Sequence, residues 1–120
     1  MVKMRWLRKQ PRVRGAVRTY VDGIGFQSKN EAERYKELKL LEKAGEIHTL
    51  KLQVKYPLYV EAQLICTYKA DFTYFEKLKC GERFVVEDAK GWRTDLYRFK
   101  KKLFEVVNFP QTITETKGGR

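Results

Sequence analysis

The chain has 120 residues and a formal net charge of +11, with 42% hydrophobic and 34% charged residues. This length suits one domain, and no apolar run approaches the roughly 20 residues of a membrane span. Two cysteines and a single histidine do not form a zinc-binding pattern, and free thiols are typical of a reducing compartment, so we expect a cytoplasmic protein. The positive charge indicates a polyanionic partner, with nucleic acid as the leading candidate.

The first 19 residues are rich in lysine and arginine and contain no acidic residue. Pro11 and Gly15 argue against a continuous helix there. We expect a basic arm, residues 1–19, that lies along a phosphate backbone, and a solvated tail is the alternative for its first dozen residues. The candidate DNA contacts in this arm are Arg5, Arg8, Lys9, Arg12 and Arg14.

A small hairpin and a helix follow the arm. Asp22-Gly23 between short β-prone stretches predicts a type I′ turn. The helix begins after Ser28, a good N-cap, and Gly45 is expected at its C′ position. Lys29, in its first turn, is a further candidate DNA contact.

Glu31 lies on the inward face of this helix, in line with the apolar stripe of Tyr35, Leu38 and Leu41. A capping box with Ser28 is enough to explain a glutamate at this position. A carboxylate on the inward face of a first turn could equally bind a metal ion or a water molecule. Both roles stay open at the level of sequence.

Strands dominate the middle of the chain. Residues 51–60 alternate between apolar and polar side chains, which predicts a half-buried strand, and Pro57 favours an edge position. Residues 68–90 then form two β-prone arms around the turn at Cys80-Gly81, which predicts a hairpin.

The charges in this hairpin are placed unusually for a sheet. Asp71 interrupts an apolar run, and Asp88 and Lys90 follow Phe84 and Val86 at period two, on one face. If the turn leaves an even number of residues unpaired, Asp71 lies on that same face. Two carboxylates and a lysine suit a Mg²⁺ ion that activates water beside a phosphate. The alternative is a surface hairpin with an ordinary salt bridge.

A second helix is predicted after Thr94-Asp95, with an apolar stripe of Leu96, Phe99, Leu103 and Val106. Basic side chains lie on another face of it, and an aromatic and a basic residue precede it in a loop. A short last strand follows Pro110, and residues 117–120 form a flexible tail. The candidate DNA contacts in this part are Trp92, Arg93, Arg98, Lys101 and Lys102.

The order of a helix, three antiparallel strands, a helix and a strand resembles the core of the PD-(D/E)xK, restriction-endonuclease-like nucleases. More narrowly, the chain is similar to a small phage-encoded family of uncharacterised proteins called DUF1064. The similar segments are DGIGFQSKNEAERYKEL, KADFTYF, VVEDAKGWRT and Leu50 to Gln53. The expected fold is therefore α/β with a mixed sheet, in one nuclease-like domain over residues 20–116.

The resemblance implies a metal site and a catalytic lysine. The strand carboxylates fall on Asp71 and Asp88, the lysine on Lys90 and the helix acid on Glu31. Mg²⁺, which Mn²⁺ could replace, would bind these carboxylates and the carbonyl of Ala89. Glu87 directly precedes Asp88, and a β-bulge would exchange their faces, but strand alternation favours Asp88.

The resemblance also implies the activity. It points to an endonuclease that hydrolyses phosphodiester bonds in duplex or branched DNA, similar to resolvases of four-way junctions, without a small-molecule cofactor. Such enzymes cut as homodimers, since two strands need two sites. One alternative is a non-catalytic nucleic-acid-binding protein on the same scaffold, and another is a phage structural or interaction protein. DNA and RNA both remain open as the nucleic acid.

Overall fold

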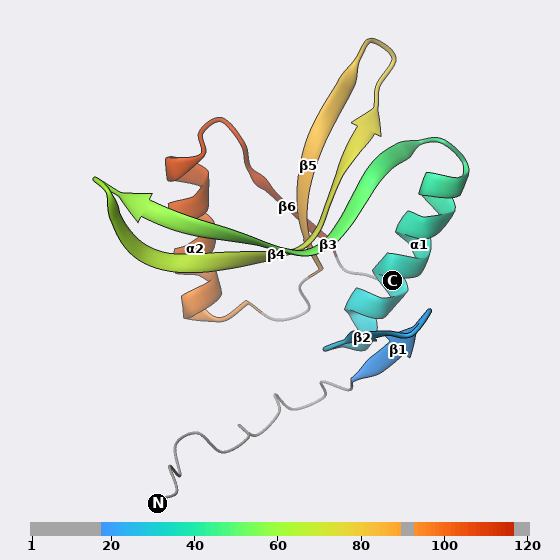
Figure 1. Cartoon of the computed structure of the whole chain (residues 1–120), viewed down its shortest axis with the longest axis horizontal. Coiled ribbons are helices and arrows are strands. Elements are labelled where there is room, and N and C mark those ends of the chain that lie inside the picture. Colours follow the sequence, from blue (N-terminus) through green and yellow to red (C-terminus); the bar gives the residue numbers. More distant parts are fainter. Residues whose placement is uncertain (1–17, 90–92, 117–120) are drawn as a thin grey trace, which may run out of the picture.

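The computed structural model describes residues 18–89 and 93–116, which form two helices, a two-stranded sheet and a four-stranded mixed sheet (Figure 1). The expected order of helix, three antiparallel strands, helix and strand is confirmed. The elements are β1 Thr19–Val21, β2 Ile24–Phe26, α1 Lys29–Lys43, β3 Ile47–Val60, β4 Gln63–Lys77, β5 Glu82–Ala89, α2 Asp95–Val107 and β6 Ile113–Thr116.

Several predicted features lie outside the described residues. They are most of the basic arm with its five arginine and lysine candidates, the loop residues Lys90 and Trp92, and the tail 117–120. Among the residues that the structure describes, no helix combines the length and the apolar character needed to cross a membrane.

The hairpin and α1 form as their local sequence predicts. Asp22 and Gly23 have φ angles of 54° and 76°, as a type I′ turn requires, and the Asp22 carboxylate accepts a hydrogen bond from the Tyr35 hydroxyl. The Ser28 hydroxyl accepts from the backbone N–H of Glu31 at 3.2 Å. At the other end, Gly45 has a φ of 82° and closes a Schellman motif. The capping signals therefore fix both ends of α1.

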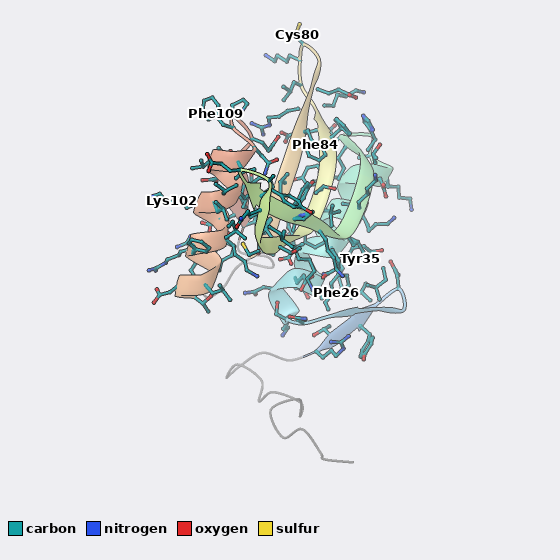
Figure 2. All side chains as sticks on the ribbon, turned by 60° about the vertical axis from the view of Figure 1, so that its left-hand side comes forward. Phe26, Tyr35, Cys80, Phe84, Lys102 and Phe109 are labelled. Atoms are coloured by element: carbon teal, nitrogen blue, oxygen red, sulfur yellow. The ribbon has the colours of Figure 1, made fainter. Side chains whose placement is uncertain are left out.

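The four-stranded sheet has the order β3-β4-β5-β6. Neighbouring strands are antiparallel except β5 and β6, which are parallel. The edge position expected from Pro57 is confirmed, because β3 is an outer strand. The two helices cover opposite sides of the sheet, with Phe26 and Tyr35 on the α1 side and Lys102 on the α2 side (Figure 2).

The long β3–β4 ribbon contributes to two separate core clusters. Leu52 and Phe72 belong to the cluster beneath α1, whereas Leu58 and Tyr68 belong to the cluster beneath α2. Between these halves lies Gln53, whose φ of 56° is a left-handed conformation inside a strand. The ribbon therefore changes its helical partner at Gln53.

The predicted apolar stripe of α2 is wrong for three of its four residues, because, of the four, only Leu103 packs, partly buried, against the core. Leu96, Phe99 and Val106 are 61%, 52% and 68% exposed, and the helix instead buries Tyr97 and Phe104. The buried face lies about 130° round the helix from the centre of the predicted stripe, at 100° per residue. Tyr97 and Phe104 carry rings that fill the space above β3 and β4, where Phe104 contacts the rings of Tyr56 and Tyr68.

Candidate active site

Asp71 on β4 lies close to the end of β5 that carries Asp88. Four residues, 78–81, lie between the paired residues Lys77 and Glu82, so the turn leaves an even number unpaired. The pairing ends at Phe72 and Glu87, and its continuation by one residue would place Asp71 opposite Asp88. The Asp71 carboxylate accepts a hydrogen bond from the Ala89 N–H at 3.0 Å. The even turn that the prediction required is therefore confirmed, and Asp71 contacts the residue that follows Asp88.

Asp88 is buried and held by a tyrosine. Its carboxylate accepts a hydrogen bond from the Tyr68 hydroxyl at 2.6 Å. Burial, and then the negative charge of Asp88, raise the pKa of Tyr68 above its usual range. Tyr68 therefore stays protonated at neutral pH and remains a donor to Asp88.

A cavity of about 200 Å³ opens beside Asp88. Tyr97 and the N-terminal turn of α2 form one side of it, and Tyr68 forms another. Two basic side chains, Lys69 and Lys100, also line it. The carboxylate thus lies in a small space bordered by positive charge, where an anionic group could enter.

Glu31 lies in the first turn of α1, and its side chain contacts the β3–β4 ribbon at Gln53, where the ribbon passes from the α1 cluster to the α2 cluster. The Glu31 carboxylate accepts a hydrogen bond from the Gln53 side-chain amide at 2.5 Å. Burial raises the pKa of Glu31, and the charge of Asp88 acts in the same direction. The carboxylate of Glu31 is therefore near enough to Asp88 to respond to its charge, although each has its own hydrogen-bond donor.

The raised pKa of Glu31 gives a pH-dependent stability. Because the folded-state pKa lies above the value of 4.5 for the unfolded chain, the free energy of unfolding should fall as pH rises from 4.5 through the folded-state pKa. Glu31→Gln keeps an acceptor for Gln53 and should remove this fall, so that it is more stable than wild type at pH 7. Urea unfolding at pH 4 to 7 tests this, with Glu33→Gln on the same helix as the control. A decline in the Glu31→Gln protein as steep as that of wild type would refute it.

Glu87 lies on the opposite face from Asp88 and is fully buried. Its carboxylate accepts two hydrogen bonds from Arg34, at 2.5 and 3.0 Å, one from Tyr74 at 2.6 Å and one from Thr116 at 2.8 Å. The β4–β5 register is continuous through Glu87, so no bulge exchanges it with Asp88. The donors around Glu87 tie β5 to α1, β4 and β6, which is a structural role.

The three acidic candidates do not form one compact ligand cluster. In the ranges 18–89 and 93–116, no group of three His, Cys, Asp or Glu side chains is placed to hold a metal ion. The candidate ligands themselves are carboxylate oxygens, the hard donors that suit Mg²⁺. Asp71 contacts the residue after Asp88, whereas the Glu31 carboxylate accepts a hydrogen bond from Gln53.

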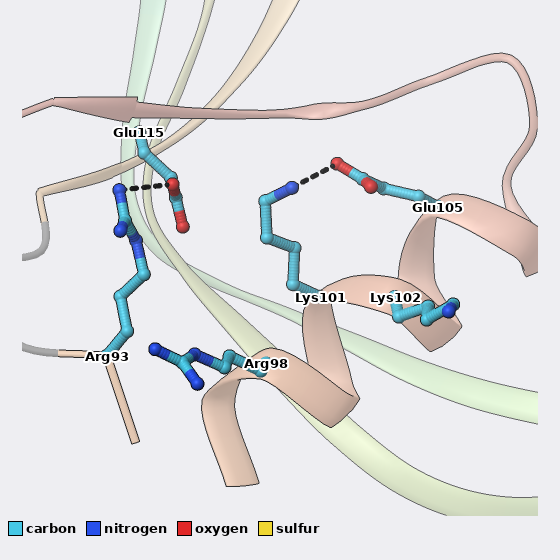
Figure 3. A pocket seen from close by; sticks show the side chains of 6 residues that line it. All are labelled: Arg93, Arg98, Lys101, Lys102, Glu105 and Glu115. Carbon is cyan, nitrogen blue, oxygen red and sulfur yellow. Dashed lines mark hydrogen bonds and ion pairs between the residues drawn. The ribbon is translucent and has the colours of Figure 1, made fainter. Parts of the chain in front are cut away.

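The predicted basic contacts of α2 gather around a pocket of about 520 Å³ (Figure 3). Four of its lining residues are basic and two are acidic: Arg93, Arg98, Lys101, Lys102, Glu105 and Glu115. Lys29 is not among them and lies exposed at the start of α1, on the other side of the sheet.

Sequence reasoning missed four residues of this region. Gln53 falls within the alternating pattern of residues 51–60, and nothing in the sequence marks its left-handed backbone. Glu115 pairs with Asp88 in the parallel β5–β6 register, and Tyr97 donates to Glu115 at 2.7 Å. Parallel pairing places Asp88 and Glu115 on one face, a relation that only the β6 register reveals. Tyr68 was missed because its hydroxyl reaches Asp88 from β4 across the strand pair.

The family model described as "Protein of unknown function (DUF1064)" matches residues 13–116. This match spans every strand and helix of the described structure, together with Glu31, Asp71 and Asp88. No curated protein and no solved structure matches the chain. The chain therefore belongs to the DUF1064 family of proteins of unknown function.

Proposed function

We propose that the protein is a metal-dependent nuclease that hydrolyses phosphodiester bonds in DNA. The observation that carries this proposal is the pair of carboxylates, Asp71 and Asp88, close together on neighbouring strands, with Asp88 lining a cavity that two lysines also line. A buried carboxylate is expensive to keep in a sheet, and hydrophobic side chains would pack there at less cost. In a chain of net charge +11, this acidic pair beside basic residues suits a cation and a phosphate together.

Asp71, Asp88 and the carbonyl of Ala89 would hold the metal ion, Mg²⁺ or Mn²⁺, with Glu31 bound directly or through water. Within a strand the N–H and C=O of one residue point the same way, so the Ala89 N–H bonded to Asp71 puts its carbonyl on the same side. A metal ion bound there would stabilise the charge that develops on the phosphate and lower the pKa of a bound water.

Other side chains would set the geometry and the local charge. Tyr68 holds the Asp88 carboxylate in one orientation, and the Ala89 N–H does the same for Asp71. Lys69 and Lys100 would offset the negative charge of a phosphate entering the cavity. Lys90, which lies outside the described residues, would position the attacking water.

The proposed substrate is DNA, which the protein would cut at internal positions as an endonuclease. Selectivity for junctions or other branched forms would follow from two sites acting together. Cutting two strands at one place needs two copies of the site, so the proposed active form is a homodimer. The second candidate is a binding protein that uses the same scaffold without catalysis. It is favoured by the absence, within the described ranges, of a group of three His, Cys, Asp or Glu side chains that could hold a metal ion.

The test is a cleavage assay on labelled four-way junctions, flaps, linear duplex and single strands, as DNA and as RNA. The protein should cut at least one of these in Mg²⁺ or Mn²⁺ and none in EDTA, and Lys90→Ala should lose the cutting. The preferred substrate then identifies the class of nuclease. Binding without cutting in either metal, unchanged in Lys90→Ala, would reject catalysis and support the binding protein.

A further inference from the structure

We infer that the basic pocket of α2 binds a phosphate of the nucleic-acid strand whose neighbouring segment occupies the Asp71–Asp88 site. This inference rests on the proposed function for the location of the second segment. The binding of a phosphate by guanidinium and ammonium groups depends only on the residues that line the pocket. The phosphate is either internal to the strand or the terminal phosphate of a strand end.

The lining of the pocket favours an anion. Four cationic and two anionic side chains give it a net charge of +2. A volume of about 520 Å³ accommodates a phosphate with its flanking sugar, and lies within the usual 300–1,000 Å³ of binding pockets. Figure 3 shows the Arg98 side chain next to Arg93, whereas the Lys101 ammonium points toward Glu105 and Lys102 points away from the two arginines.

Two of the four basic side chains of the pocket form close ion pairs with glutamates, and the other two do not. Arg93 pairs with Glu115 at 2.9 Å, and Lys101 pairs with Glu105 at 3.0 Å. Within the described part of the chain, Arg98 pairs only with Asp95, at 3.9 Å on the open surface, where such a pair contributes little. Among the described residues Lys102 has no ion-pair partner. Arg98 and Lys102 can therefore neutralise a phosphate without first breaking a strong internal ion pair.

The side chain of Tyr97 connects the basic pocket to the cavity beside Asp88. Tyr97 lines the cavity of Asp88, and its hydroxyl donates to Glu115, which lines the basic pocket. Glu115 is also the register partner of Asp88. A strand that occupied both spaces would cross Tyr97, with one phosphate on each side of it.

Helix α2 supplies cations to both spaces. Lys100 lines the Asp88 cavity, whereas Arg98, Lys101 and Lys102 line the basic pocket. A single rigid helix thus fixes the separation between two phosphate-binding positions. Arginine forks and lysine ammonium groups are the usual protein partners of nucleic-acid phosphates.

The experiment measures binding of labelled single-stranded and duplex oligonucleotides in EDTA, with a 5′-phosphate or a 5′-hydroxyl, over a series of salt concentrations. The test variant is Arg98→Ala/Lys102→Ala, and Arg98→Gln/Lys102→Gln is a second version that keeps longer polar side chains. The control is Lys36→Ala/Lys43→Ala, which removes the same charge from exposed positions of α1, on the other side of the sheet. Circular dichroism verifies that each protein is folded.

Both pocket variants should bind about tenfold more weakly, and the slope of log affinity against log salt should fall by about 1 per lost phosphate contact. The control should retain most of its affinity and slope. A loss confined to 5′-phosphorylated probes identifies a strand end, whereas an equal loss on both probes identifies an internal phosphate. Equal losses in pocket and control variants, or no loss in either, would overturn the inference.

The result of this binding assay can be distinguished from the result of the cleavage assay that tests the nuclease. The binding assay contains no metal, so a protein that never cuts DNA can still confirm the pocket. Conversely, metal-dependent cleavage with a KM unchanged in both pocket variants would reject the pocket and keep the nuclease.

Discussion

Asp88→Asn is expected to reduce metal-dependent cleavage by at least about 10²-fold, the scale for loss of one group that stabilises transition-state charge. Asparagine has the shape of aspartate and keeps an acceptor for the Tyr68 hydroxyl, but it carries no negative charge toward a cation. Because Asp88 is buried, removal of its charge should leave the fold intact. The loss would therefore report on chemistry rather than on folding.

The same variant has a second readout that needs no cleavage. Mn²⁺ bound to the native protein raises the free energy of unfolding by about 2.7 kcal/mol at a hundred times its Kd. Wild type should show such a rise in Tm, and Asp88→Asn should not. Glu46→Gln, at an exposed position after α1, is the matched control and should behave as wild type in both assays. Full cleavage by Asp88→Asn would remove this residue from the proposed site.

Glu87→Ala and Arg34→Ala should each cost about 3–5 kcal/mol of stability, the usual effect of removing one partner of a buried ion pair. Glu87 is fully buried and accepts hydrogen bonds from Arg34, Tyr74 and Thr116, so its loss leaves three donors without their acceptor. Loss of Arg34 instead leaves a buried carboxylate without its counter-charge. The stability lost in either variant is a large part of the free energy of unfolding of a typical domain, about 5–15 kcal/mol.

Guanidinium unfolding followed by circular dichroism measures these costs. Arg83→Ala breaks the exposed ion pair with Glu76 and should cost less than about 1 kcal/mol. The double variant Arg34→Met/Glu87→Leu removes both charges and should recover much of the stability lost in the single variants. If Glu87→Ala costs no more than Arg83→Ala, the Glu87 network does not stabilise the fold as described.

The sequence predicted the elements whose signals are local. The caps of α1 depend on Ser28 and Gly45, which act within one turn of the helix. The shared face of Asp71 and Asp88 depends on period-two alternation and on an even turn, and both can be counted along the chain. The choice of Asp88 over Glu87 for the site face also followed from alternation, and the continuous register supports it.

The features that sequence reasoning missed depend on contacts between distant segments. Helix α2 carries apolar side chains on two faces, and periodicity alone cannot decide which face meets the sheet. The left-handed backbone of Gln53 lies where the ribbon passes from one core cluster to the other, a change that is not visible in residues 51–60. The pairing of Asp88 with Glu115 depends on where β6 docks beside β5.

The division of the core at Gln53 also bears on the order in which the protein opens. The α1 cluster and the α2 cluster share strands but contain separate buried side chains, so each can behave as a cooperative unit in hydrogen exchange. The Glu87 network lies with the α1 unit, whereas Asp88 faces the α2 unit. A local opening of the α2 unit would therefore expose Asp88 to solvent while Arg34 and Glu87 keep the rest of the sheet closed.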